Sequence, residues 1–170
     1  MADQALVRLD ANVLPSEIRT RFSGLAAKYS PADNTEGWYY KLTDITTTSS
    51  ALIASDSYLS KGGTDRGADS ATASATASYS DKVKFLLVIH TGTEDDGTTM
   101  NEDSVYLNID GSTAAHNGAT CIEIGYREAW YGKMNNTTVA DINVIAGASG
   151  GSGTASNKIQ CIVAAILDDI

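Results

Sequence analysis

Apolar and polar residues alternate along the second half of the chain, which is the pattern of half-buried β-strands. In the run 104–109, for example, Val105, Leu107 and Ile109 lie on one side of an extended chain. Comparable runs occupy residues 38–45, 83–91, 119–125, 128–133, 139–146 and 159–167. Turn-forming Gly, Asn, Asp and Ser residues separate them. The pattern predicts an all-β fold: an antiparallel sandwich of seven or eight strands, either jelly-roll or immunoglobulin-like.

The N-terminal residues follow a different pattern. Residues 1–13 are expected to form an arm, and Leu14-Pro15-Ser16-Glu17 then resembles a helix start, with proline in the first turn. Up to Pro31, apolar residues recur at helical spacing, namely Ile18, Phe22, Leu25, Ala26 and Tyr29. We expect a short helix that either covers one end of a sheet or docks on a partner subunit.

Two parts of the chain can therefore be distinguished. Residues 1–36 form the arm and short helix, and residues 37–170 form the β-sandwich domain. A low-complexity stretch of Gly, Ala, Ser and Thr at 61–80 is expected to be a flexible loop of this domain. The length of 170 residues fits one domain with an arm.

Charge and composition narrow the classes of function. The chain carries 12 Lys and Arg against 21 Asp and Glu, for a net charge of −9. Because such a chain is repelled by phosphates, nucleic acid is not an expected partner. The longest apolar runs, 85–89 and 162–167, are too short to span a bilayer, and no signal peptide is visible at the N-terminus. We expect a soluble protein made in the cytoplasm.

One catalytic motif is formally present. Residues 147–151 match the G-x-S-x-G nucleophile elbow, whose serine needs a strand-to-helix turn and a histidine later in the chain. The two histidines, His90 and His116, both precede Ser149, and loop-forming residues follow it. The sequence therefore favours a Gly/Ser connection between strands. We predict no catalytic residue and no enzyme; a hydrolase using Ser149 is the least favoured alternative.

The sequence also contains residues that could form a metal site or a disulfide, but it favours neither. The acidic residues at 94–96 and 101–103 share one loop and could hold Ca²⁺, but their spacing does not match an EF-hand. The histidines have no short ligand spacing to a cysteine. We therefore expect no metal and no cofactor. Cys121 and Cys161 both lie in strand-like runs, where two buried thiols are favoured over a disulfide, although the sequence leaves their pairing open.

Aromatic residues fall into two clusters, which are candidates for a subunit interface or, if exposed, for stacking on sugars. We expect alternate rings to pack in the core and the others to lie at an interface. The candidates for the interface are Trp38, Tyr126, Trp130 and Tyr131.

The segment Ile122–Gly132 (IEIGYREAWYG) resembles a strand–turn–strand unit of bacteriophage head-decoration and fibre-like β-domains. That unit has alternating apolar residues, a short turn, and then a glutamate with an aromatic residue two positions after it. This chain places Tyr126 and Arg127 in the turn, where smaller residues are expected. The resemblance covers about residues 81–170 and implies a non-enzymatic virion structural protein. The role it implies is that of a capsid decoration or cement subunit that stabilises the capsid lattice.

The resemblance also implies partners. These are the major capsid protein or other virion subunits, together with further copies of this chain, a trimer being favoured. The apolar residues of the arm and helix are the candidate capsid-binding residues, namely Leu6, Val7, Leu9, Val13, Leu14, Ile18 and Phe22. The alternative function is a carbohydrate- or receptor-binding domain of the fibre or lectin type.

Overall fold

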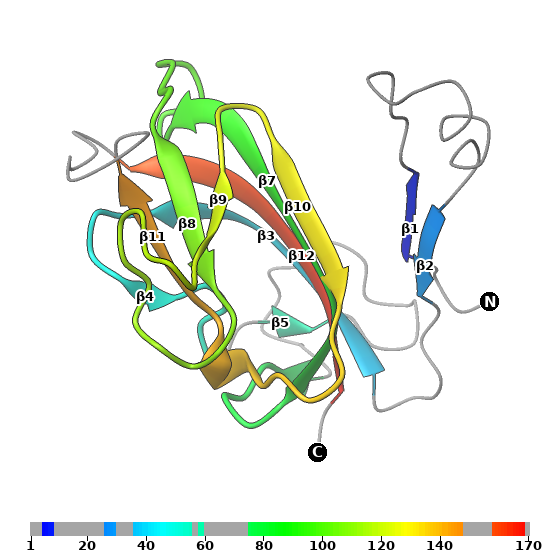
Figure 1. Cartoon of the computed structure of the whole chain (residues 1–170). Coiled ribbons are helices and arrows are strands. Elements are labelled where there is room, and N and C mark those ends of the chain that lie inside the picture. Colours follow the sequence, from blue (N-terminus) through cyan, green and yellow to red (C-terminus); the bar gives the residue numbers. More distant parts are fainter. Residues whose placement is uncertain are drawn as a thin grey trace, which may run out of the picture.

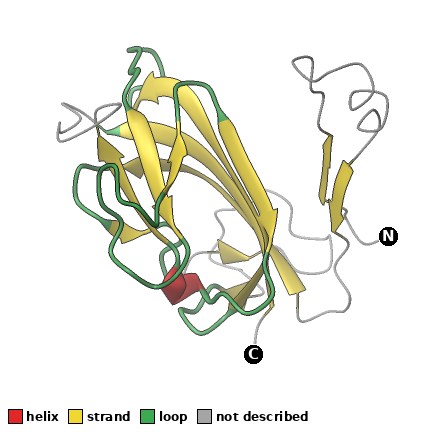
Figure 2. Ribbon diagram, in the orientation of Figure 1, coloured by secondary structure: helices red, strands yellow, loops and turns green. Residues whose placement is uncertain are grey.

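The structure, a computed structural model, describes residues 5–8, 26–29, 36–55, 58–59, 75–147 and 158–168. Nearly all of these residues form strands and turns (Figures 1 and 2), and one short 3₁₀ helix, η1 (Val139–Asp141), lies among them. Within these ranges no helix is long and apolar enough to cross a membrane.

Two four-stranded antiparallel sheets pack face to face and form the sandwich that the sequence predicts. Sheet I contains, in spatial order, β10 (Ala129–Lys133), β7 (Lys82–Glu94), β12 (Ile159–Asp168) and β3 (Glu36–Ile45). Sheet II contains, in spatial order, β4 (Ser50–Ala51), β11 (Asn143–Gly147), β8 (Ser104–Asn108) and β9 (Ile122–Ile124).

The order of the strands is that of a jelly roll. The first and last strands of the sandwich, β3 and β12, pair with each other, and three further pairs are nested inside them: β4 with β11, β7 with β10, and β8 with β9. The pairing of β12 with β7 and of β11 with β8 then assembles these pairs into two sheets. Such a rolled-up set of antiparallel pairs distinguishes the jelly roll from the immunoglobulin-like arrangement.

The main core lies between the two sheets and follows the predicted alternation. Val105 and Leu107 of β8 point inward and are fully buried. On β12, every second residue points into the same core and is fully buried, namely Ile159, Cys161, Val163, Ala165 and Leu167. Burying each large aliphatic side chain contributes about 1.5–3 kcal/mol, so this layer accounts for much of the stability of the sandwich.

The N-terminal part contains a β-hairpin where the sequence predicts the end of a helix. β1 (Ala5–Arg8) pairs antiparallel with β2 (Ala26–Tyr29), and the pair lies beside the sandwich (Figure 1). The helix prediction is therefore wrong for Ala26–Tyr29. Spacing of apolar residues is a local signal, whereas a strand is stabilised by a partner far away in the sequence. The rest of the predicted helix lies outside the described residues.

The predicted loop at 61–80 lies mostly outside the described residues as well. Its end is described: β6 (Ala75–Thr76) pairs with β5 (Tyr58–Leu59), and Ala77 is buried in the main core. At this end of the stretch, therefore, Ala77 packs into the sandwich, whereas Thr76 and Ser78 beside it are exposed.

Candidate interaction surface

The outward side of sheet I is an apolar face built from three rows of paired residues. Residues paired directly across antiparallel strands point to the same side of a sheet, and the alternate residues of β12 point into the core. The rows that result are Leu42–Ile162–Ile89–Ala129, Tyr40–Ala164–Leu87–Tyr131 and Trp38–Ile166–Phe85–Lys133. We call these residues the outer face of sheet I. Lys133 is its only charged residue, which is unusual for the outside of a sandwich.

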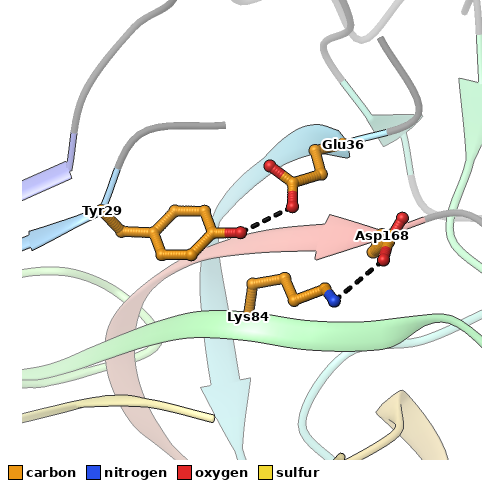
Figure 3. Close-up of polar contacts among 4 residues, drawn as sticks. All are labelled: Tyr29, Glu36, Lys84 and Asp168. Atoms are coloured by element: carbon orange, nitrogen blue, oxygen red, sulfur yellow. Dashed lines mark hydrogen bonds and ion pairs between the residues drawn. The ribbon is translucent and has the colours of Figure 1, made fainter. Parts of the chain in front are cut away.

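The third row is packed against Tyr29 of the N-terminal hairpin. Phe85 and Ile166 are 1% and 0% exposed and pack in a small cluster that includes Tyr29 of β2. The ammonium group of Lys133 lies 5.9 Å from the centroid of the Tyr29 ring, a cation–π distance. The hydroxyl of Tyr29 donates a 2.6 Å hydrogen bond to the carboxylate of Glu36 (Figure 3). Tyr29 thus fixes the hairpin to one end of the face.

Charged residues border this same end. The Lys84 ammonium lies 2.9 Å from the Asp168 carboxylate, and Asp168 is opposite Glu36 in the register of β12 and β3 (Figure 3). Both side chains of the ion pair are about a quarter exposed, so solvent screens their attraction and the pair adds little stability. These charged residues instead form a polar border at this end of the apolar face.

The other two rows are exposed in part, at β3 and β12. Leu42, Tyr40 and Ile162 are 56%, 47% and 41% exposed, in the middle of β3 and β12. The outward side of sheet II is different, because the chain between β8 and β9 covers it. Tyr106 of β8 is only 1% exposed and clusters with Ala114 of that connection. Sheet I therefore carries three exposed large hydrophobic residues on one face, whereas Met100 and Tyr79, the other exposed large hydrophobic residues described in the sandwich, lie outside this face.

The structure separates the four aromatic residues that the sequence groups as interface candidates. Trp38 and Tyr131 lie on the outer face of sheet I and pack in the cluster around Phe85. Trp130 points the other way, against the main core, and its indole lies so close to Gly132 that a Cβ there would be 2.9 Å from the ring.

Tyr126 lies in a separate place, in the turn between β9 and β10. The guanidinium carbon of Arg127 is 5.0 Å from the centroid of the Tyr126 ring, and the ring of His90 meets it edge-on at 6.2 Å. Gly92 allows this packing, since a Cβ there would lie 2.8 Å from both Tyr126 and Arg127. The Tyr126 ring therefore packs against side chains of its own chain.

His90 is buried and fully hydrogen-bonded. Its Nδ1 accepts a 2.9 Å hydrogen bond from the backbone N–H of Gly92, so Nε2 carries the proton and donates to the carbonyl oxygen of Asp103 at 2.8 Å. Burial lowers the pKa of His90 below its usual value of 6.5, although the hydrogen bond to Asp103 and the charges of Asp103 and Glu128 partly oppose this. The neutral ring therefore joins β7 to the loop before β8 as a structural group.

The G-x-S-x-G motif begins at a crowded position. The ring of His116 lies directly on Gly147, where a Cβ would be only 1.8 Å from the Nδ1 atom of the ring. His116 Nδ1 is buried without a hydrogen-bond partner. The structure thus brings a histidine close to the start of the motif, which the chain order did not suggest. Ser149 itself lies outside the described residues, so the motif stays a sequence observation.

The acidic loop is organised by local hydrogen bonds. Asp96 accepts hydrogen bonds from Thr98 and Thr99, led by the Thr99 hydroxyl, and these hold the pKa of Asp96 well below its usual range. Asp95 lies 3.3 Å from the ammonium of Lys158. In the part of the chain that the structure describes, no three His, Cys, Asp or Glu residues are grouped to hold a metal ion.

The two cysteines are free thiols in different layers. Cys161 is in the main core, where burial, together with the charge of Asp44, raises the pKa of its thiol to about 12. Cys121 packs on the opposite side of sheet II, in the cluster around Tyr106. The sequence interpretation of two thiols without a disulfide is confirmed, but only Cys161 is buried, whereas Cys121 is partly buried.

Sequence reasoning missed the residues that make the outer face prominent: Tyr29, Tyr40, Leu42 and Ile162. One signal was available in the sequence, because β12 is apolar on both of its sides. Of the predicted arm residues, Leu6 and Val7 lie in β1, with Leu6 51% exposed. The other five, Leu9, Val13, Leu14, Ile18 and Phe22, lie outside the described residues.

Comparison of the chain with protein-family models, with curated proteins and with solved structures found no match.

Proposed function

We propose that this protein is a non-enzymatic structural subunit of a bacteriophage virion, which attaches to the capsid lattice as a decoration or cement subunit. The observation that carries the proposal is the outer face of sheet I. An apolar sheet face that exposes Tyr40, Leu42 and Ile162 together is suited to lasting contact with another protein. The strand order adds support by analogy of fold, because jelly rolls recur in viral capsid proteins.

The proposed partners are the major capsid protein and further copies of this chain. A subunit of a capsid coat must bind at many equivalent positions, through exposed apolar segments or strand edges. The N-terminal hairpin offers such a segment, since Leu6 of β1 is 51% exposed beside the sandwich. We assign attachment to this hairpin and to the apolar residues that follow β1 in the sequence.

The test is binding of the purified full-length chain to phage heads assembled without it. Co-sedimentation should show saturable binding at a fixed number of copies per head, and loaded heads should withstand a higher temperature before they release DNA. A Leu6→Asp variant should bind more weakly, while Tyr79→Asp, a change at a comparably exposed residue of the sandwich, should bind like the natural chain. Failure of the natural chain to sediment with heads would refute the proposal.

The alternative, a carbohydrate- or receptor-binding domain, draws on the same analogy, because lectins also use jelly rolls. It requires an open aromatic ring to stack on a sugar. The two rings expected to stack on a sugar are not open in this way, because Tyr126 is packed against Arg127 and Trp130 lies on Gly132 and the core. A glycan array probed with the natural chain and with Trp130→Ala separates the two functions: a signal lost in the variant, without head binding, favours the alternative.

A further inference from the structure

We propose that the exposed rows of the outer face of sheet I are covered by the same face of another copy of this chain. The face is then the self-association surface of the protein. This inference extends the proposed structural role. Only the position of the oligomer on a capsid rests on the proposed function. Self-association itself can be measured without any capsid.

The first argument is that the residues that the structure describes leave part of this face exposed to solvent. Tyr29 reaches the third row, where Phe85 and Ile166 are almost fully buried. The first and second rows keep Leu42 and Tyr40 about half exposed. A protein that covers the outside of sheet II with its own loop, and leaves these rows exposed, has an apolar surface that water solvates poorly.

The second argument concerns charge. Two copies with a net charge of −9 repel each other, so they associate best through a surface that carries no carboxylate. The exposed rows satisfy this condition, since none of their residues is charged. Beyond the first row lies the Asp44–Gln160 pair, and beyond the third lie Glu36, Lys84 and Asp168. An apolar centre with a polar border is the usual anatomy of an interface.

The third argument is self-complementarity. Identical uncharged faces need no pairing of opposite charges, so a two-fold or three-fold arrangement can turn the face of every copy toward the symmetry axis. In the two-fold arrangement the two sheets pack about 10 Å apart, with the large side chains of one between those of the other. Tyr40, Leu42 and Ile162 project far enough from the sheet to fill such a layer.

The experiment measures the mass of the full-length chain by sedimentation equilibrium over a wide range of concentration. The natural chain should form a dimer or a trimer. Tyr40→Glu and Leu42→Glu each place a charge in the buried layer and should raise the dissociation constant by about tenfold or more. Tyr79→Glu is the matched control, because Tyr79 and Tyr40 are both 47% exposed, and it should leave the dissociation constant unchanged.

A milder variant, Leu42→Ser, guards against misfolding and should weaken association in the same direction, with a circular dichroism spectrum like that of the natural chain. A natural chain that stays monomeric at every concentration overturns the proposal. This holds whether the face is then covered by residues 9–25 of the same chain or by a capsid protein. An oligomer that Tyr40→Glu leaves intact overturns it as well. Normal head binding by a monomeric natural chain would overturn only the self-association, and leave the proposed function standing.

Discussion

The hydroxyl of Tyr29 lies 2.6 Å from the carboxylate of Glu36 and donates a hydrogen bond to it, so the N-terminal hairpin is fixed to the first strand of the sandwich. The same ring packs on Phe85 and Ile166, and it receives the ammonium of Lys133 at 5.9 Å. One side chain thus combines a polar and an apolar contact at the end of the outer face of sheet I. The attachment of the hairpin depends on this residue.

Tyr29→Phe keeps the ring and removes the hydroxyl. We expect a loss of about 1.5–3 kcal/mol in the free energy that docks the hairpin, because one hydrogen bond to a carboxylate is lost while the apolar contact stays. Amide hydrogen exchange in Ala26–Tyr29 should become about tenfold faster or more. Tyr79→Phe, at an exposed tyrosine, is the control. Unchanged exchange in Tyr29→Phe would show that the hydrogen bond does not hold the hairpin.

His90 should make the stability of the sandwich depend on pH. Its pKa in the folded protein is lower than 6.5, the usual value, which applies to the unfolded chain. Above pH 6.5 the ring is neutral in both states, and its contribution is fully present. As the pH falls below this value, the unfolded chain takes up a proton before the folded one, so the free energy of unfolding decreases until the folded pKa is reached.

The measurement for His90 is urea denaturation at a series of pH values. His90→Gln cannot gain a proton, so the fall in stability between pH 6.5 and the lower folded pKa should be smaller in this variant than in the natural chain. His116→Gln controls for the other histidine. Equal pH profiles of the natural chain and His90→Gln would contradict the assignment of a buried neutral ring.

Gly147 and His116 should be coupled in a double-mutant cycle. Gly147→Ala places a methyl group only 1.8 Å from the present position of His116 Nδ1, so the imidazole must move. We expect a loss of about 2 kcal/mol from this overpacking. Adding His116→Ala removes the clash, and the double variant should be more stable than the sum of the two single losses predicts. Additive losses would mean that the ring does not lie on Gly147.

The two thiols should differ in reactivity. The Cys161 thiol is buried in the core with a pKa of about 12, so it forms almost no thiolate at neutral pH. Cys121 is only partly buried. Alkylation of the folded protein followed by mass spectrometry should label Cys121 first, and Cys161 only after unfolding by urea. Labelling of Cys161 at the rate of Cys121 would contradict the buried position of β12.

Much of the sandwich can be predicted from the sequence, because its strands alternate between a core side and an outer side. The run 104–109 is an example: Val105 and Leu107 are in the core. The hairpin strand Ala26–Tyr29 could not be predicted, since its partner, Ala5–Arg8, is far away and its apolar residues also fit a helix. The jelly-roll order likewise depends on pairings between strands distant in the sequence.

The candidate surface was harder to foresee for a related reason. Alternation shows that Tyr40 and Leu42 share a side of β3, but not whether that side is the core. Only the register with β12 and β7 joins them to Ile162 and Leu87 as one face. Tyr39, the neighbour on the other side of the strand, is the one that is buried.

The most direct test of the central claim, that the outer face of sheet I is an association surface, is hydroxyl-radical footprinting of two tyrosines. Tyr40 and Tyr79 are both 47% exposed in the single chain, so their oxidation rates should be similar at high dilution. Upon assembly, at high concentration or on phage heads, the oxidation of Tyr40 should fall severalfold while that of Tyr79 stays the same. Equal oxidation of the two tyrosines in every state, or protection of Tyr79 alone, would contradict the account.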